Sequence, residues 1–127
     1  ESIVVGDGVW FGQDVFVSDA GHGYQDPDVP IGDQFGSHDP VVIGPGSWIG
    51  HGAILLQGTR LGRNVVVAAG SVVRGEVPDH AIVAGTPARV VRRYEPGIGW
   101  VGRTGDVRPV VRADYRQDAL TELRERA

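Results

Sequence analysis

The sequence predicts an all-β protein that is built as a coil of short parallel strands, with one protruding loop and a short helical tail. Three observations support this prediction. The chain of 127 residues has 20 glycines, only 7% aromatic residues and a valine-dominated aliphatic set, and β-branched residues favour strands. A six-residue period runs through most of the chain, and one segment rich in glycine, proline and aspartate interrupts it. The length suits a single domain.

The composition excludes several classes of function. The net charge is −4 and the arginines are spread along the chain, so no basic patch supports a nucleic-acid partner. There is no cysteine, which excludes disulfides, a thiolate nucleophile and cysteine-ligated metal. No apolar run approaches the roughly 20 residues of a membrane span. Because the sequence starts at Glu1 rather than at methionine, we interpret it as part of a longer protein.

The repeat consists of nine six-residue units. The first three, from Val5, are VGDGVW, FGQDVF and VSDAGH. The other six, from Ile43, are IGPGSW, IGHGAI, LLQGTR, LGRNVV, VAAGSV and VRGEVP. The first position of every unit is Val, Ile, Leu or Phe, the fifth is mostly small, and five of the nine second positions are glycine.

A period of six fits neither the 3.6 residues of a helical turn nor the simple alternation of a strand. It fits a short strand followed by a bend, with the first-position side chain pointing inward and glycine relieving backbone crowding near the turn. Three such sides close a triangle of eighteen residues, and successive triangles stack as parallel strands about 4.8 Å apart. Residues 5–22, 43–60 and 61–78 would form three turns.

The interruption is predicted to be an insertion. Trp10 and Trp48 both hold position six of a first-side unit and lie 38 residues apart, which is one turn of eighteen plus twenty residues. Residues 23–42 therefore form a loop that leaves the coil at a corner. A long loop on a rigid scaffold usually serves a function, and His22 lies at its root.

These units resemble the hexapeptide repeats of the left-handed parallel β-helix acyltransferases, over residues 3–92. The segment AGSVVRGEVPDHAIVAGTPARVVRR resembles the closing segment of many of these enzymes. The order VFVSDAGH, loop, PVVIGPGSWIG is similar to the sugar-acetylating branch, which includes maltose and galactoside acetyltransferases. SDAGHGYQDPDVPI is most similar to the O-acetyltransferases of surface polysaccharides. The resemblance implies a left-handed coil, with residues 1–94 as the acyltransferase domain.

The resemblance implies transfer of an acetyl group from acetyl-CoA to a hydroxyl of a sugar or a surface-polysaccharide precursor. His22 would be the catalytic general base. The chain has no cysteine and no serine beside a plausible base, so direct transfer is favoured over a covalent intermediate. Asp19, the nearest carboxylate in sequence, would orient the base, and Asp26 and Asp28 would contact acceptor hydroxyls. The alternative for these aspartates is an ordinary solvated loop.

The resemblance also implies a coenzyme A site along the outside of the coils, with the phosphates held by arginines. Matched position by position, the cofactor-binding residues would be Trp48, Gly50, His51, Ala69, Arg74, Arg89 and Arg92. Relatives often have lysine where this chain has Gly75, which weakens the phosphate site. Trp48 as a packing residue and the last two arginines as solvated charges are the alternatives. The oxyanion-stabilising asparagine of relatives would lie upstream of Glu1.

Two other uses of this coil are alternatives. The γ-type carbonic anhydrases bind zinc through three histidines, two of them five positions apart, but the histidines here are at 22, 38, 51 and 80. We therefore expect no metal. A non-catalytic trimerisation or scaffold domain is the second alternative. As in relatives, we expect a cytoplasmic homotrimer.

From Glu95 on the repeat is absent. We predict that residues 95–127 form a C-terminal linker, including PGIGWVGRTGDVRP, followed by a short charged helix over residues 112–126. Leu120 and Leu123 would give this helix a thin apolar face. We assign no chemistry to this region.

Overall fold

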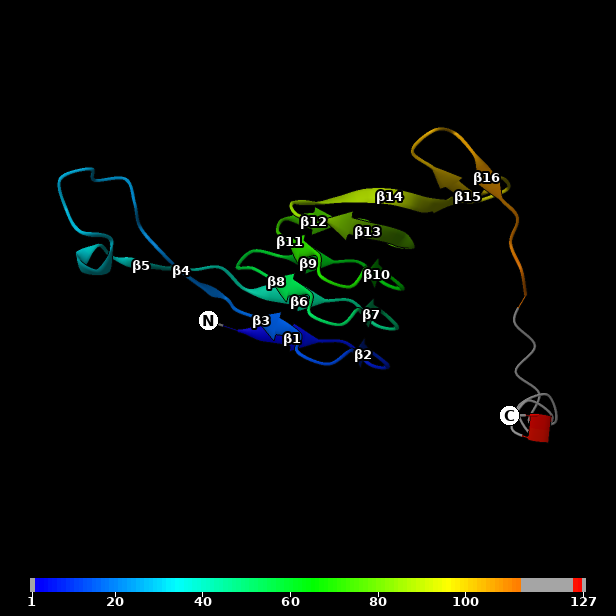
Figure 1. Ribbon diagram of the computed structural model, residues 1–127, viewed down its shortest axis with the longest axis horizontal. Coiled ribbons are helices and arrows are strands. Elements are labelled where there is room, and N and C mark those ends of the chain that lie inside the picture. Colours follow the sequence, from blue (N-terminus) through cyan, green and yellow to red (C-terminus); the bar gives the residue numbers. More distant parts are fainter. Residues whose placement is uncertain (1, 113–124, 127) are drawn as a thin grey trace.

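The computed structural model describes residues 2–112 and 125–126 of the chain. Its centre is a coil with three flat sides, here called faces A, B and C, and each face is a parallel sheet to which every turn contributes one strand (Figure 1). Face A contains β1 (Ile3–Val5), β6 (Val41–Ile43), β9 (Arg60–Leu61) and β12 (Glu76–Val77); face B contains β2 (Trp10–Phe11), β7 (Trp48–Ile49), β10 (Val66–Val67) and β13 (Ala81–Gly85); face C contains β3 (Phe16–Val17), β8 (Ile54–Leu55) and β11 (Val72–Val73).

The strand register confirms the predicted coil. Trp10 pairs with Trp48, 38 residues later, and Trp48 pairs with Val66 after a regular turn of eighteen residues. The last turn is shorter, because Arg60 pairs with Glu76. All strand pairs between successive turns of the coil are parallel.

The core lies along the axis of the coil and consists of the first and fifth positions of the repeat. Ile43, Ile49 and Leu55 are at most 1% exposed. The buried fifth positions include hydroxyl side chains, and these have partners. The hydroxyl of Thr59, for example, lies 2.7 Å from the carbonyl oxygen of Leu56 and 2.9 Å from that of Val73. Within the described residues, every buried polar side-chain atom therefore has a hydrogen-bond partner.

The second-position glycines lie where successive turns touch. A Cβ on Gly44 would lie 2.2 Å from the carbonyl oxygen of Gly62, and one on Gly50 would lie 2.6 Å from the amide nitrogen of Ala69. This confirms the predicted backbone crowding and identifies its source as the next turn. At the corner between faces C and A, the second positions are instead Ser18, Leu56 and Arg74. That corner accommodates side chains.

The predicted insertion is present, but its ends differ from the prediction. Ala20–His22 (β4) pairs antiparallel with Gly36–His38 (β5), and the 3₁₀-helix η1 (Ile31–Asp33) lies between them. This hairpin projects from the corner between faces C and A (Figure 1). The prediction that all of residues 17–22 form a side of the coil is wrong, because Ala20–His22 pairs within the hairpin. The predicted end of the loop at residue 42 is also wrong, because the chain re-enters the core at the fully buried Val41.

The predicted linker is also wrong over most of its length. After β13 the chain reverses into β14 (Ala88–Glu95), and β15 (Gly99–Gly102) and β16 (Val107–Arg108) extend the sheet of face B as antiparallel strands. We call strands β14–β16 the cap. They pair antiparallel, so the six-residue repeat of the coil does not continue through them. Residues 113–124 of the predicted helix lie outside the described residues. Among residues 2–112 and 125–126, no helix is long and apolar enough to cross a membrane.

An arginine holds the cap strands together. Arg92, whose side chain is 14% exposed, donates to the carbonyl oxygen of Trp100 at 2.9 Å and to the carboxylate of Asp106 at 2.5 Å. The hydrogen bond from Arg92, helped by one from Thr104, holds the pKa of Asp106 below its ordinary value of 3.8. Arg92 is thus a structural residue of the cap.

A Gly44→Ala substitution tests the contact between successive turns. The new Cβ would meet backbone atoms, which cannot rotate away, so we expect a loss of about 1–3 kcal/mol in the free energy of unfolding. Gly32→Ala is the control, because nothing lies within 4 Å of its Cβ position and neither glycine has a positive φ. Urea denaturation followed by circular dichroism measures both. Equal effects of the two substitutions would contradict the close contact.

An Arg92→Ala substitution tests the cap. We expect a lower urea midpoint than the wild type at pH 7. Arg89→Ala should leave the midpoint unchanged, because in the described part of the chain the guanidinium of Arg89 bonds only to the neighbouring carbonyl of Ala88. The lowered pKa of Asp106 means that its pairing contributes stability above pH 3.8 and loses it as the pH falls through the folded-state pKa. The difference between wild type and Arg92→Ala should therefore shrink in acid. A difference that is independent of pH would argue against the ion pair.

Candidate active site

His22 ends β4, two residues beyond Ala20, whose pair with His38 lies nearest the coil. It pairs with Gly36 across the hairpin, and the preceding residue, Gly21, pairs with Ser37. The His22 side chain is exposed. Within residues 2–112 and 125–126, its imidazole forms no hydrogen bond or ion pair, so both ring nitrogens are available to a ligand.

A cavity of about 570 Å³ opens beside His22 at the corner between faces C and A. Its walls come from the hairpin and from two later turns of the coil. The lining residues are His22, Gly23, Tyr24, Gln25, Phe35, Ser37, His38, Asp39, Gln57 and Arg74. The cavity therefore combines an imidazole, a guanidinium, aromatic rings and small hydrogen-bonding groups.

Asp39 attaches the hairpin to the coil. The carboxylate of Asp39 lies 3.4 Å from the guanidinium of Arg60, and its carbonyl accepts a hydrogen bond from the amide of Gly58 at 3.0 Å. Its own amide donates to the carbonyl oxygen of Asp19 at 2.9 Å. These bonds fix the two ends of the insertion to each other and to the next turn.

Asp19 was predicted to orient His22, and Asp26 and Asp28 to contact the acceptor, but the bonds that these three residues form in the structure are within the insertion. Asp19 contributes its backbone carbonyl to the root of the hairpin, and in the described part of the chain its carboxylate makes no hydrogen bond to His22. Asp26 accepts a hydrogen bond from the amide of Asp28 at 3.0 Å and lines a separate cavity of about 350 Å³ inside the loop. Gln34 donates to the carbonyl oxygen of Asp26. The structure thus gives Asp26 and Asp28 a part in shaping the loop.

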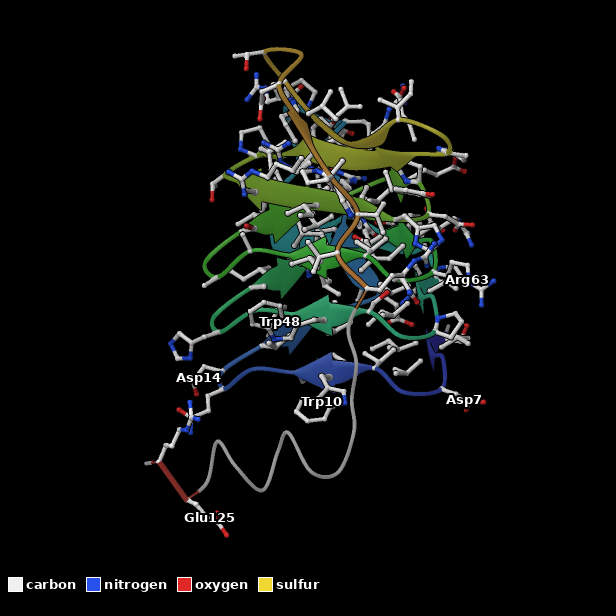
Figure 2. All side chains as sticks on the ribbon, turned by 90° about the vertical axis from the view of Figure 1, so that its right-hand side faces the viewer. Asp7, Trp10, Asp14, Trp48, Arg63 and Glu125 are labelled. Carbon is white, nitrogen blue, oxygen red and sulfur yellow. The ribbon has the colours of Figure 1, made fainter. Side chains whose placement is uncertain are left out.

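Most of the predicted cofactor residues form a column at the corner between faces B and C. Trp48 projects outward from face B above Trp10 and is 56% exposed (Figure 2). His51, which follows the buried Gly50, accepts a hydrogen bond at its carbonyl from the amide of Gly70. Ala69 lies directly beyond Gly50 in the next turn.

This column continues to the cap. The hydroxyl of Thr86 lies 3.5 Å from the carbonyl oxygen of Gly70 and the amide of Gly85 donates to the hydroxyl of Ser71 at 3.2 Å. Arg89 follows this turn and pairs with Ala84 at the edge of face B. The predicted residues Trp48, Gly50, His51, Ala69 and Arg89 therefore lie along one edge of the coil.

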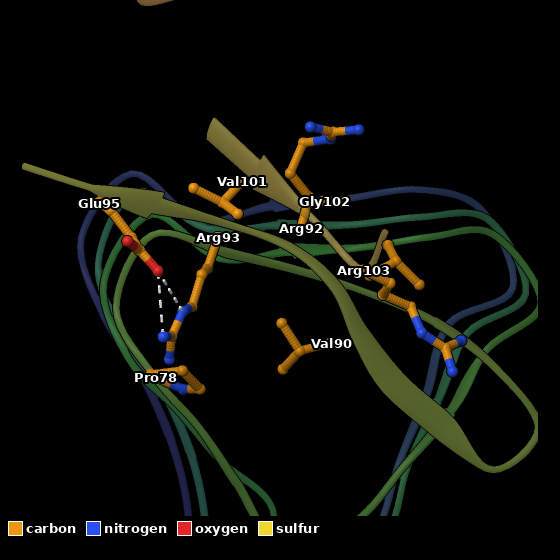
Figure 3. A pocket seen from close by; sticks show the side chains of 9 residues that line it. Pro78, Val90, Arg92, Arg93, Glu95, Val101, Gly102 and Arg103 are labelled. Carbon is orange, nitrogen blue, oxygen red and sulfur yellow. Dashed lines mark hydrogen bonds and ion pairs between the residues drawn. The ribbon is translucent and has the colours of Figure 1, made fainter. Parts of the chain in front are cut away.

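The remaining predicted arginines lie elsewhere. Arg74 lines the cavity of His22, across face C from the column. Arg92 is bound to Trp100 and Asp106. A cavity of about 330 Å³ between β14 and β15 is lined by Arg92, Arg93 and Arg103 among others, and there Arg93 bonds to Glu95 at 3.1 Å (Figure 3).

Of the ten residues that line the His22 cavity, sequence reasoning named His22 and Arg74 as site residues and missed the other eight, among them Tyr24, Phe35, Ser37 and Gln57. Tyr24 and Phe35 are 75% and 96% exposed, and their position in a loop without a period gave no sign that both line one cavity. Ser37 and Gln57 lie 20 residues apart and bond to each other. Gln57 could have been found from the spacing of the turns. Leu55 pairs with Val17, so the corner that follows Leu55 lies beside the point where the chain leaves the coil.

Comparisons with known proteins agree with this geometry. Residues 40–75 match the family described as Bacterial transferase hexapeptide (six repeats). Over 93 residues, 73% of this chain, the sequence is 41% identical to a probable acetyltransferase of Mycobacterium tuberculosis, and the match covers 31% of that protein. It is 35% identical over 101 residues to the putative lipopolysaccharide biosynthesis O-acetyl transferase WbbJ of Escherichia coli, covering 74% of this chain and 52% of that one.

The fold is similar to that of a galactoside acetyltransferase solved in complex with coenzyme A, with a TM-score of 0.65 at 30% identity. The similarity covers 72% of this chain and 44% of that enzyme, and it confirms the predicted left-handed parallel β-helix. The chain spans about half, or less, of the length of the curated relatives named here. The coil, its repeat and these relatives together identify residues 40–75 as hexapeptide repeats of the bacterial transferase type.

Proposed function

We propose that this chain is the catalytic domain of a coenzyme A-dependent O-acetyltransferase in which His22 is the general base and a sugar or glycan hydroxyl is the acceptor. The observation that supports this proposal most is the cavity beside His22, which combines an available imidazole with Arg74 and two exposed aromatic rings. The relatives named as acetyltransferases and the coenzyme A bound to the galactoside enzyme support the reaction type.

The proposed reaction needs one base and no covalent enzyme intermediate. The neutral imidazole of His22 accepts the proton of the acceptor hydroxyl while the hydroxyl oxygen attacks the carbonyl carbon of acetyl-CoA. The new C–O bond forms, the C–S bond breaks, and the sulfur of coenzyme A leaves with the electron pair and takes up a proton. His22 is suited to this step because no protein group in the described residues occupies its ring nitrogens.

The cavity walls support a sugar acceptor. Tyr24 and Phe35 line the cavity and are exposed, and an aromatic face packs against the apolar C–H face of a sugar ring. Gln25, Ser37 and Asp39 supply hydrogen-bonding groups that can orient the ring hydroxyls. Asp26 and Asp28 act indirectly in this proposal, by holding the loop that carries Tyr24.

Coenzyme A is proposed to lie along the column between faces B and C. Trp48 and the backbone around Gly50, His51 and Ala69 would contact the pantetheine arm, and Arg89 would bind a phosphate. Arg74 has no hydrogen bond or ion pair within the described residues. Because it lines the cavity of His22, it would contact a phosphate of coenzyme A that lies along the column of a neighbouring subunit. The guanidinium of Arg92 is already bound within the cap.

The position of this column supports a homotrimer. In one chain, the column and the cavity of His22 lie at different corners, separated by face C. A neighbouring subunit that places its column beside the His22 corner would complete the site. Apolar side chains on two faces suit such head-to-tail packing: Trp10 and Trp48 on face B, and Phe16, 56% exposed, on face C. Face A has the exposed Arg60 and Glu76 on its later strands, besides the exposed apolar β1.

A His22→Asn substitution tests the base. For the protein with its upstream residues, we expect kcat to fall about 10²- to 10⁴-fold, measured as thiol release from acetyl-CoA in the presence of galactosides, maltose and glycan precursors. His80→Asn is the matched control, because His80 packs on Tyr94 and has a φ of 53°, which asparagine tolerates. Unchanged turnover in His22→Asn would refute the base, and no thiol release by the wild type with any acceptor would favour the scaffold alternative.

Light scattering tests the assembly. The protein with its upstream residues should have the mass of a trimer, since the proposed site is shared between subunits. A monomeric mass at the protein concentration of the activity assay would contradict the shared site.

A further inference from the structure

We propose that Gln57 is a positioning residue for His22, because its side chain crosses the β4–β5 hairpin and fixes the base of the insertion against the coil. The proposal rests on the proposed function, in which His22 is the general base. It assigns Gln57 no contact with the reacting atoms.

Gln57 reaches the hairpin from the next turn of the coil. It follows β8, which pairs with β3, so its corner lies beside the point where the first turn ends. The side-chain amide of Gln57 lies 3.1 Å from the hydroxyl of Ser37 and can accept from it or donate to it. Ser37 pairs with Gly21, one step from the pair formed by His22 and Gly36.

Gly21 provides the space that Gln57 occupies. A Cβ at residue 21 would lie 2.3 Å from Nε2 and 2.8 Å from Cδ of Gln57. The φ of Gly21 is not positive, so its backbone does not require glycine. The missing Cβ is therefore explained by the passage of the Gln57 side chain across the strand that ends in His22.

A second attachment of the hairpin to the coil, through Asp39, allows the role of Gln57 to be tested by substitution. Asp39 is bonded to Arg60, Gly58 and Asp19 independently of Gln57. The hairpin therefore stays joined to the coil when Gln57 is removed, and what changes is the placement of the segment next to His22. A general base acts only within hydrogen-bonding reach of its proton, and a small misplacement lowers the rate strongly.

The test is a set of variants in the protein with its upstream residues, assayed with acetyl-CoA and the best acceptor. Gln57→Ala should lower kcat about 3- to 10-fold, the size of one lost hydrogen bond, with little change in KM for acetyl-CoA. Gly21→Ala should do the same, because the flexible end of Gln57 can move away without unfolding the protein. The double variant should be no slower than Gln57→Ala, since both changes remove one interaction.

Arg63→Ala is the control. Arg63 holds the same third position of the following repeat unit, and it is exposed at the corner between faces A and B. Its removal should leave kcat unchanged. Additive losses in the double variant, or an unchanged kcat in Gln57→Ala, would overturn the proposal.

Amide hydrogen exchange separates this proposal from the proposed function. Gln57→Ala and Gly21→Ala should speed the exchange of the hairpin amides around His22 and Ser37, while Arg63→Ala should not. If His22→Asn keeps full activity, the base is refuted, and faster exchange in the first two variants would still show the attachment. Unchanged exchange in both would overturn the attachment as well.

Discussion

The stacking of successive turns at backbone-contact distance is the constraint on which the rest of this structure depends. Gly44 and Gly50 have no Cβ because the next turn occupies its place, and the aliphatic first positions fill the space inside. Close stacking keeps the parallel strands in register over successive turns. At two of the three corners the second positions are glycine, apart from Ala68, and a Cβ on Gly44 or Gly50 would meet the backbone of the next turn. The third corner, between faces C and A, has Ser18, Leu56 and Arg74 there, and this corner carries the insertion and the cavity.

This difference between corners connects the fold to the chemistry. The hairpin starts from a rigid coil, so its first residues have a fixed position, and the bonds of Asp39 with Arg60 and Gly58 hold them there. The fixed end of the hairpin is the pair of Ala20 with His38, and His22, the side chain that needs to be placed accurately, ends the strand that starts there. Tyr24 and Phe35 belong to the loop beyond this strand pair. This is the arrangement of a rigid scaffold that presents a binding loop.

Much of the fold could be predicted because burial repeats every six residues. The period alone identified Ile43, Ile49 and Leu55 as core residues and paired Trp10 with Trp48. The ends of the insertion could not be predicted, because the pairing of Ala20–His22 with Gly36–His38 satisfies backbone groups over a long separation and leaves no periodic pattern. The cap strands were missed for the same reason, since they pair with each other after the repeat ends.

The candidate site was predictable in part. His22 came from the resemblance together with the break in the repeat, and the structure places it in a cavity with Arg74. The resemblance predicted that Arg92 binds the cofactor, and no pattern in the sequence indicates its bond to Asp106, 14 residues away. The position of Gln57 beside Gly21 follows only from the stacking of two turns.

A crystal structure of the protein with its upstream residues, bound to coenzyme A and an acceptor, tests the central claim most directly. The account predicts that an acceptor hydroxyl lies about 3 Å from a ring nitrogen of His22, with the sulfur of coenzyme A on the other side of that hydroxyl. Coenzyme A in a cleft that His22 does not reach, with the imidazole facing open solvent, would contradict it.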